Sequence, residues 1–150
     1  MEIKISEVTQ KYWTSEDFLE LNQADTVASM YAIARRVIGR MPRPIVEVCG
    51  PIASGGLGNP EANLELFNKT IQKLQDQALN VFDQMPFEIP MQQLKKKLAH
   101  PSEILDGFYL PLFESKDIST LYFIPNWQSS IGSNWEHDLG KKLGIEIIYL

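Results

Sequence analysis

The stretch that decides the fold is "STLYFIPNWQSSIGSNWEHDLGKKLGIEIIYL", residues 119–150. It opens with a short apolar run typical of a buried strand and continues through a loop of small polar residues. A helical pattern then runs from about Ser133 to Leu143. Gly144 ends the helix, because glycine readily takes the left-handed backbone conformation found there. "IEIIYL" (145–150) is a second strand, so the stretch predicts a parallel pair of strands joined by a helical crossover.

The same order of elements begins upstream, at Pro44. "IVEVC" (45–49) is short, β-branched and mostly apolar, which is typical of a central parallel strand. The glycine-rich loop "GPIASGGLGNP" (50–60) follows it. An amphipathic helix is expected after this loop, with Asn59 as its N-cap. "LNVFD" (79–83) is the next predicted strand.

The pattern between residues 85 and 117 is less regular. A short helix is expected at 91–98, and the segment 102–117 is expected to be helical in part, although Gly107 and Pro111 weaken its pattern. Strands that alternate with helices predict an α/β fold in which a parallel sheet is covered by helices on both faces.

The N-terminal part of the chain has a different character. A helical pattern runs from about Ser15 to Arg40, with imperfect spacing that fits either one helix or two. "GRMPRP" (39–44) ends it, because proline lacks a backbone donor and disfavours helix in the residue before it. We therefore expect an N-terminal helical extension at 1–43 and an α/β domain at 44–150.

Composition narrows the class of protein. The chain has 150 residues, 44% of them hydrophobic, and a net charge of -5, which predicts a single globular domain and argues against a nucleic-acid polymer as partner. Cys49 is the one cysteine, so an intrachain disulfide and a zinc site built from several cysteines are excluded. No long apolar run or signal peptide is present, so we expect a cytoplasmic protein without a membrane span, and we expect no cofactor and no metal.

Two loops are expected to meet at the ligand site. In open parallel sheets, ligands bind beyond the carboxyl ends of the strands, where the strand order reverses. Loops 50–59 and 125–133 should lie there, and they are the loops richest in glycine and serine. Loop 50–59 lacks the lysine of a triphosphate-binding loop and the spacing of a dinucleotide fingerprint. It is consistent with an anion site at a helix N-terminus and equally with a tight turn.

Glu47 is unusual because it is the third residue of a strand that should be buried on both faces. Alternation places Glu47 and Cys49 on one face of the sheet, with Val46 and Val48 on the other. A buried carboxylate costs several kcal/mol unless it is paired or faces a wet cavity. Two interpretations are open: a pocket residue, or one half of a buried ion pair with an arginine of the N-terminal helix.

Glu136 also has two interpretations. Ser133 and Glu136 form an S-x-x-E pattern, which is a capping box at the start of a helix. Alternatively, the helix N-terminus keeps the carboxylate ionised and nucleophilic, while Ser129, Ser130 and the N–H groups around Gly132 hold an anionic group beside it. The local sequence leaves both interpretations of Glu136 open. It also leaves open whether Trp127 and Trp135, which flank the loop, stack on a base or pack in the core.

A family resemblance adds to this picture. "VEVCGPI", "NLELF" and "LYFIPNWQSSIGSNWEHDLGKKLGIEIIY" resemble the nucleoside 2-deoxyribosyltransferase-like superfamily, over residues 44–150 and most specifically in the C-terminal third. The resemblance is to a branch of small proteins within it. The matching C-terminal positions are Ile124, Pro125, Asn126, Trp127, Ser130, Gly132, Ser133, Glu136, Gly140, Leu143 and Gly144.

The resemblance implies a flavodoxin-like, Rossmann-like sheet of about five strands. It also implies that Glu136 attacks the anomeric carbon of a nucleoside or nucleotide, that Ser130 contacts a phosphate, and that water or a second base resolves a glycosyl-enzyme intermediate. It further implies a homo-oligomer, a dimer or tetramer, whose neighbours complete one another's sites. The implied substrate-binding residues are Gly50, Pro51, Ser54, Gly55, Trp127, Ser129, Ser130 and Gly132.

The sequence departs from the family at the acid–base positions. Glu47 stands where the family commonly has a tyrosine. The family also has an aspartate eight residues before the start of the fourth strand, and here that position is Tyr109, with Asp106 and Glu114 nearby. We take Glu136, Glu47 and Asp106 as the candidate catalytic residues. Two functions follow: an N-glycosidase or 2-deoxyribosyltransferase, or a catalytically inactive nucleotide-binding or protein-interaction module on the same fold.

Overall fold

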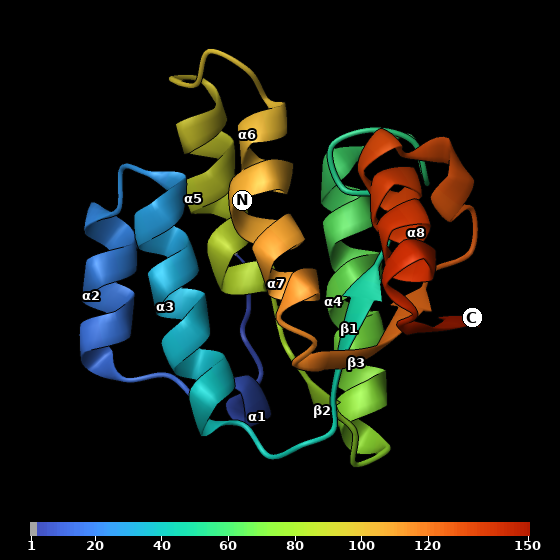
Figure 1. Cartoon of the computed structure of the whole chain (residues 1–150), viewed down its shortest axis with the longest axis horizontal. Helices are drawn as coiled ribbons and strands as arrows, with labels where there is room; N and C mark the ends of the chain where they lie inside the picture. The colour runs from blue at the N-terminus through green and yellow to red at the C-terminus, as the bar shows by residue number, and fades with distance from the viewer. Residues whose placement is uncertain (1–2) are drawn as a thin grey trace.

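A parallel sheet is the centre of the computed structural model, which describes residues 3–150. Across these residues the sheet has four strands, all parallel, in the order β2-β1-β3-β4 (Figure 1). They are β1 (Ile45–Cys49), β2 (Asn80–Val81), β3 (Ile118–Phe123) and β4 (Glu146–Tyr149). The α/β fold with a parallel sheet is confirmed, but the expectation of about five strands is wrong, because residues 3–150 form four. The sequence pattern itself marks these same four.

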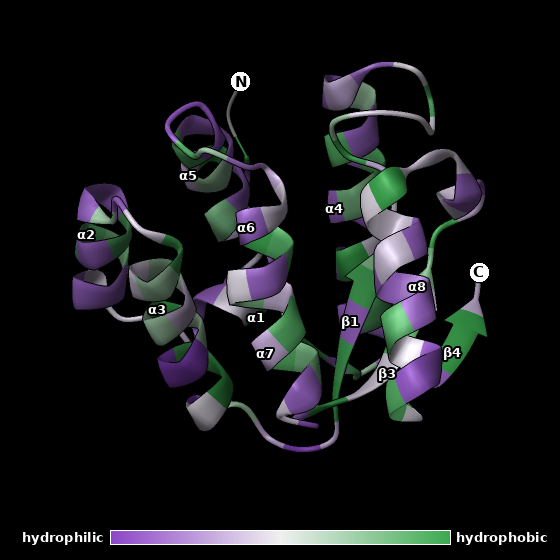
Figure 2. Ribbon diagram, turned by 45° about the horizontal axis from the view of Figure 1, so that its top comes forward, coloured by the Kyte–Doolittle hydropathy of each residue, from purple (hydrophilic) through white to green (hydrophobic). Residues whose placement is uncertain are grey.

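The central strand β1 divides its side chains between two cores, as its alternation predicts. Val46 and Val48 join a core beneath α4 (Pro60–Asp76). Ile45 and Cys49 face the larger core on the opposite side of the sheet. All five residues of β1 are buried, which matches a parallel strand covered on both faces. Figure 2 shows the apolar strands beneath helices whose outer faces are polar.

The expected helix after the first glycine-rich loop is confirmed. Asn59 caps α4 by accepting a hydrogen bond from the Ala62 N–H through its side chain, and Pro60 takes the first helical position. Leu64, Phe67 and Ile71 recur on the buried face of this helix.

Helices from the rest of the chain cover the other face of the sheet (Figure 1). They are α5 (Met85–Lys95), α6 (Ser102–Ile104), the π-helical turn η1 (Leu105–Tyr109), α7 (Leu110–Glu114) and α8 (Ile131–Leu143). The helix expected at 91–98 is wrong in its bounds, because α5 begins at Met85 and contains Pro90 in its interior. In residues 3–150 no helix is both long and apolar enough to cross a membrane.

Residues 3–43 share the main core with the sheet. They form α1 (Glu7–Gln10), α2 (Ser15–Gln23) and α3 (Val27–Arg40), so the imperfect helical pattern contains two helices. Met30, Ile33 and Val37 of α3 belong to the same buried cluster as Ile45 and Leu121 of the strands. Figure 1 shows α2 and α3 beside the α5 and α6–α7 columns, away from α8 and β4.

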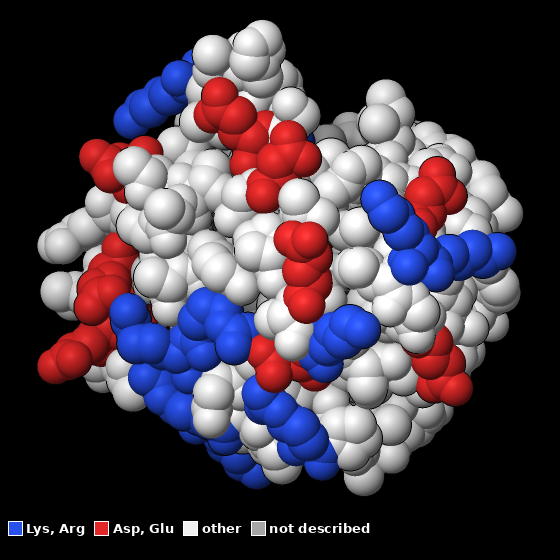
Figure 3. All heavy atoms as spheres, viewed as in Figure 1, with Lys and Arg blue, Asp and Glu red and all other residues white. Residues whose placement is uncertain are grey.

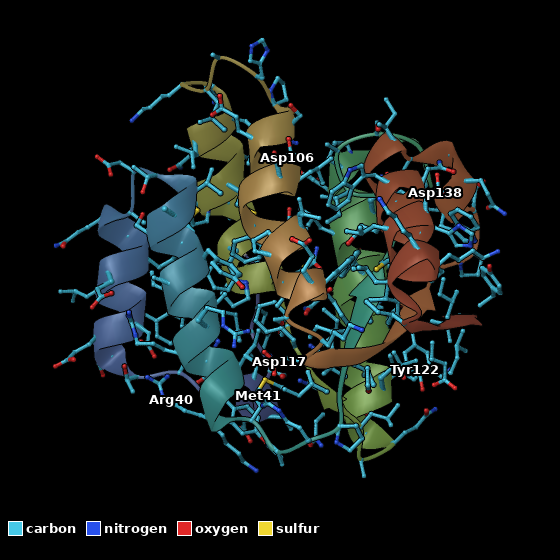
Figure 4. The ribbon with its side chains drawn as sticks, viewed as in Figure 1. Arg40, Met41, Asp106, Asp117, Tyr122 and Asp138 are labelled. Atoms are coloured by element: carbon cyan, nitrogen blue, oxygen red, sulfur yellow. The ribbon has the colours of Figure 1, made fainter. Side chains whose placement is uncertain are left out.

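Four arginines around α3 form ion pairs rather than a free basic patch. Figure 3 shows basic side chains gathered over the C-terminal half of α3, and Figure 4 labels Arg40 and Asp117 near the C-terminal ends of α3 and α7. The N–O distances are 2.6 Å for Arg35–Asp117, 2.9 Å for Arg43–Asp117, 3.1 Å for Arg36–Asp17 and 2.6 Å for Arg40–Asp17. Asp17 is therefore a buried acceptor that ties α2 to α3.

Asp17 should make stability depend on acid pH. Burial alone would raise the pKa of this carboxyl, but hydrogen bonds from Arg40, Thr14 and Arg36 outweigh it and lower the pKa to about 2. An unfolded aspartate has a pKa of about 3.9, so the stabilisation is present above pH 4 and is lost as pH falls from about 4 to 2. Because Arg36 and Arg40 are partly exposed, we expect the ionised Asp17 to contribute about 2 kcal/mol to the free energy of unfolding.

The check is urea unfolding of the wild type and Asp17→Asn at several pH values. We expect the difference in free energy of unfolding to be largest near neutral pH and to shrink between pH 4 and 2. Parallel pH profiles of the two proteins would show that the ion pairs do not lower the pKa of Asp17.

Candidate functional site

A cavity of about 410 Å³ opens beyond the carboxyl ends of β1 and β3. The strand order reverses at this point, because β2 and β3 flank β1 on opposite sides. Loop 50–59 and the start of α8 both reach the cavity, as expected for an open parallel sheet. Of the predicted site residues, five line it: Gly50, Ser54, Ser130, Gly132 and Glu136.

Three predicted binding residues shape the loops instead. The Ser129 hydroxyl accepts a hydrogen bond from the Gly56 N–H at 2.7 Å and donates one to the Asn126 carbonyl at 2.7 Å, so it fastens the two loops together. Gly55 packs against Ser129 with a positive φ of 71°. Pro51 lines a separate cavity of about 50 Å³. None of the three lines the 410 Å³ cavity.

Trp127 lies on another side of the C-terminal loop. Its ring stacks on the His137 ring, with centroids 4.2 Å apart, and on Tyr149 at 6.0 Å. The His137 ring also contacts the Tyr149 hydroxyl, with 2.6 Å between Nε2 and Oη. Trp127 therefore packs against α8 and β4 and does not line the cavity.

The contact between the two loops gives a prediction at Gly55. An alanine Cβ there would overlap the Ser129 carbonyl oxygen and would also force a left-handed backbone on an L-residue. Gly58 has a φ of 83° but open space around it. We expect Gly58→Ala to lower the free energy of unfolding by about 1 kcal/mol, and Gly55→Ala by at least about 1 kcal/mol more.

Chemical denaturation of both variants checks this expectation. Both alanines pay the cost of a left-handed backbone, so this cost cancels when the two losses are compared. The remaining difference measures the steric contact with Ser129. Equal losses at the two positions would mean that the loops do not touch as described.

Glu136 is not a helix cap, so the capping-box interpretation is wrong. The N-cap of α8 is Ser130, whose hydroxyl accepts a hydrogen bond from the Ser133 N–H at 3.3 Å. Glu136 therefore lies in the second turn of the helix, beyond the reach of the free N–H groups at its start. Its Oε2 accepts a hydrogen bond from the Cys49 thiol of β1, with 3.5 Å between Sγ and Oε2.

Close packing of α8 on the sheet explains this contact. A Cβ at Gly140 would lie 2.8 Å from Cδ1 of Leu121 on β3, so only glycine allows this approach without a shift. Glu136 is one turn before Gly140 and shares its face, because residues four apart lie above one another on a helix. The carboxyl group is therefore directed towards the sheet and is buried.

Glu47 lies behind the cavity wall with no hydrogen-bond partner. Its side chain is fully buried, and within the described part of the chain neither carboxylate oxygen is paired. The ion-pair interpretation is wrong, because Arg35, Arg36, Arg40 and Arg43 pair with aspartates elsewhere.

Glu47 instead belongs to a cluster of three side chains that we call the acid–thiol cluster: Glu47, Cys49 and Glu136. One ligating atom from each lies within 4.8 Å of the others. Burial and the neighbouring Glu136 raise the pKa of Glu47 well above its usual range, and burial raises that of the Cys49 thiol.

The position of Glu136 in α8 does not favour the ionised form that was expected from the helix N-terminus. Burial, with a contribution from Glu88, raises the pKa of Glu136 to about 8, although the contact with Cys49 opposes the shift. The field of a helix dipole falls off within the first turn, and Glu136 lies beyond it. The carboxyl group is therefore mainly protonated at neutral pH in the free protein.

Three further ionisable side chains line the cavity, Glu88, Lys95 and Tyr109, and none of them was predicted as a site residue. Glu88 of α5 is buried, accepts a hydrogen bond from Nε2 of Gln84 at 3.2 Å, and has a pKa raised to about 7 by burial. Tyr109 of η1 lies in the wall where the resemblance implied an aspartate. The single acid in the apolar run "MPFEIPM" (85–91) was a usable signal for Glu88, by the same argument that singled out Glu47.

Asp106 lies away from this chemistry. Its side chain is exposed, and it does not line the cavity. Figure 4 shows it on the α6 side of the column that ends in α7. Tyr109, three residues later, is buried on this column and faces the cavity.

The fold and the site together define an α/β protein with an acidic cavity at the switch point of a parallel sheet. No protein-family model, curated protein or solved structure matches the chain. The function is therefore inferred from the residues that line the cavity.

Proposed function

We propose that this protein cleaves or transfers the N-glycosidic bond of a nucleoside or nucleotide, with Glu136 as the residue that bonds to the anomeric carbon. The observation that carries the proposal is the position of the Glu136 carboxyl group, which lines the cavity instead of capping its helix. The resemblance of residues 44–150 to the nucleoside 2-deoxyribosyltransferase-like superfamily points to the same residue.

The walls of the cavity suit such a substrate. A volume of about 410 Å³ lies within the range of small-molecule sites, roughly 300–1,000 Å³. Ile52, Met91 and Leu105 supply apolar surface for a base. Ser130 and Gly132 at the N-terminus of α8 supply a positive helix end for a hydroxyl or a phosphate.

Glu88 completes an acid–base pair with Glu136. In the first step the bond from C1 of the sugar to the base nitrogen breaks, and its electron pair leaves with the base, which takes a proton from Glu88. An oxygen of Glu136 bonds to C1. Water then attacks C1, gives a proton to Glu88 and releases Glu136, so the configuration at C1 is retained. If a second base attacks C1 in place of water, the sugar is transferred to that base.

The reaction needs Glu136 ionised, although its carboxyl group is mainly protonated in the free protein. Positive charge develops on the sugar as the base departs, and a carboxylate beside it is stabilised. Glu88, with a pKa of about 7, accepts the proton that Glu136 loses. Substrate therefore moves the proton to the residue that delivers it to the base.

A catalytically inactive nucleotide-binding module is the second candidate, favoured by the same raised pKa of Glu136. A neutral carboxyl group can donate a hydrogen bond to a base or a sugar hydroxyl without attacking it. The exposed position of Asp106 also fits a site that lacks the acid of the family.

One assay separates the two candidates. The protein is incubated with a panel of nucleosides and 5′-monophosphates, with and without an acceptor base, and free base and new nucleosides are measured by chromatography. Release or exchange of base supports the enzyme. Saturable binding without release supports the module, and neither binding nor release across the panel rejects both.

A further inference from the structure

We propose that the acid–thiol cluster of Glu47, Cys49 and Glu136 is a binding site for a thiophilic divalent cation, of which Zn²⁺ is the best fit. This inference goes beyond the proposed function and does not depend on it.

The distance between Cys49 and Glu136 suits the coordination shell of zinc, and Glu47 lies close beside them. The atoms lie within 4.8 Å of one another, and Cys49 Sγ is 3.5 Å from Glu136 Oε2. Zinc–sulfur bonds of about 2.3 Å and zinc–oxygen bonds of about 2.1 Å give a sulfur–oxygen edge of roughly 3.6 Å in a tetrahedral site. One edge of the cluster already has this length.

Glu47 is the independent sign of a missing ligand. The other buried carboxylates of residues 3–150 have partners: Asp83, for example, accepts hydrogen bonds from the Thr9 hydroxyl at 2.8 Å and the Met85 N–H at 2.9 Å. Both oxygens of Glu47 are buried and unpaired, and its side chain is fully inaccessible. An orphaned buried carboxylate is costly, and a cation bound to it removes the cost.

The charge of the cluster favours a cation as well. Three acidic side chains lie together, and all three are buried. Within residues 3–150 no arginine, lysine or histidine forms an ion pair with the cluster, because the arginines of α3 and Arg43 pair with aspartates elsewhere and Lys95, which lines the cavity, has no ion pair with Glu47 or Glu136. A divalent cation would supply the missing counter-charge.

The ligand types select among metals. A cysteine thiolate favours Zn²⁺ and similar borderline-soft ions over Mg²⁺ and Ca²⁺, which prefer oxygen ligands only. The cavity reaches the cluster at Glu136, which gives the ion an entry path and leaves space for water as a further ligand. Because a metal-bound Glu136 could not attack a sugar, the cation would inhibit the proposed reaction.

The test uses the purified full-length protein, metal-free and with its thiol reduced, titrated with Co²⁺ alone as an absorbing substitute for Zn²⁺. We expect saturation at a single equivalent, with a thiolate-to-cobalt charge-transfer band that Zn²⁺ abolishes. Cys49→Ser should remove the band, and Glu47→Gln should weaken binding at least about 10-fold. Glu114→Gln is the matched control, because Glu114 is an exposed carboxylate on α7 outside both the cavity and the cluster, and it should bind Co²⁺ as the wild type does.

Two results would overturn the proposal: a wild type that does not bind Co²⁺ saturably, or binding that persists without a charge-transfer band and is unchanged in Glu47→Gln. If the variants fold poorly, thermal unfolding of the wild type decides the question, because Zn²⁺ that binds the folded state must raise its Tm. None of these measurements uses base release, so the two proposals can fail separately. A protein that binds Co²⁺ but releases no base rejects only the glycosidase. A protein that releases base but does not bind Co²⁺ rejects only the metal site.

Discussion

Glu136→Gln should lower the rate of base release by about 1,000-fold or more, because an amide cannot form the bond to C1 and the remaining groups only orient the substrate. Glutamine keeps the shape of the side chain, so α8 should remain packed on the sheet. Single-turnover release of base, measured by chromatography on the nucleoside that the wild type processes best, gives the size of the loss.

The same variant has a second readout that does not need substrate. Burial raises the pKa of Glu136 to about 8, whereas an unfolded glutamate has a pKa of about 4.3. The folded state therefore holds a proton that the unfolded chain has lost, and the wild type should lose stability as pH rises from about 4 to 8. Glu136→Gln should lose less over this range, as measured by urea unfolding.

Glu114→Gln is the matched control for both readouts. Glu114 is an exposed carboxylate on α7 outside the cavity, so base release and the pH profile of stability should match the wild type. Base release that survives in Glu136→Gln at more than a tenth of the wild-type rate would rule out Glu136 as the nucleophile.

Phe67→Ala should lower the free energy of unfolding by about 3–5 kcal/mol. Phe67 is 1% exposed and lies on the buried face of α4, packed into the core that also contains Val46 and Val48. The alanine leaves a cavity that the neighbouring Leu64 and Ile71 cannot fill, because both are held by the same helix. A loss of this size is a large fraction of the 5–15 kcal/mol typical of a domain.

Leu66→Ala tests whether position on the helix is the cause. Leu66 is the preceding residue, is 37% exposed and lies outside the buried core, so its truncation should change the free energy of unfolding by less than about 1 kcal/mol. Urea unfolding followed by far-UV circular dichroism measures both variants. Similar losses at the two positions would mean that α4 does not present Phe67 to the sheet.

The local patterns that were correctly interpreted are those in which one physical effect dominates. β1 and β3 are apolar and β-branched, and α4 has a strong helical period with an asparagine cap and a proline at its first position. In α5 the effects conflict. Pro86 fits its first turn, but Pro90 lies inside the helix and hides the continuous pattern, so the expected helix began too late and Glu88 was missed.

The start of α8 could not be settled locally because two serines compete for it. Ser133 is followed by a glutamate at capping-box spacing, whereas Ser130 is not, yet Ser130 is the N-cap. The contact of Ser129 with the Gly56 N–H holds the preceding loop and fixes where the helix can begin. That contact joins residues 73 positions apart, and no local pattern contains it.

By itself, the sequence determined the α/β fold with a parallel sheet and the edge of the sheet where a cavity should open, because strand and helix periods are local and topology fixes where loops gather. Only the tertiary structure decided what the cavity contains. Glu136 and Cys49 meet across 87 positions of sequence, Glu88 and Tyr109 arrive from α5 and η1, and Asp106 is left in solvent. The physical reason is desolvation: the pKa of a carboxyl group depends on how distant elements pack around it, and that packing exists only in the folded chain.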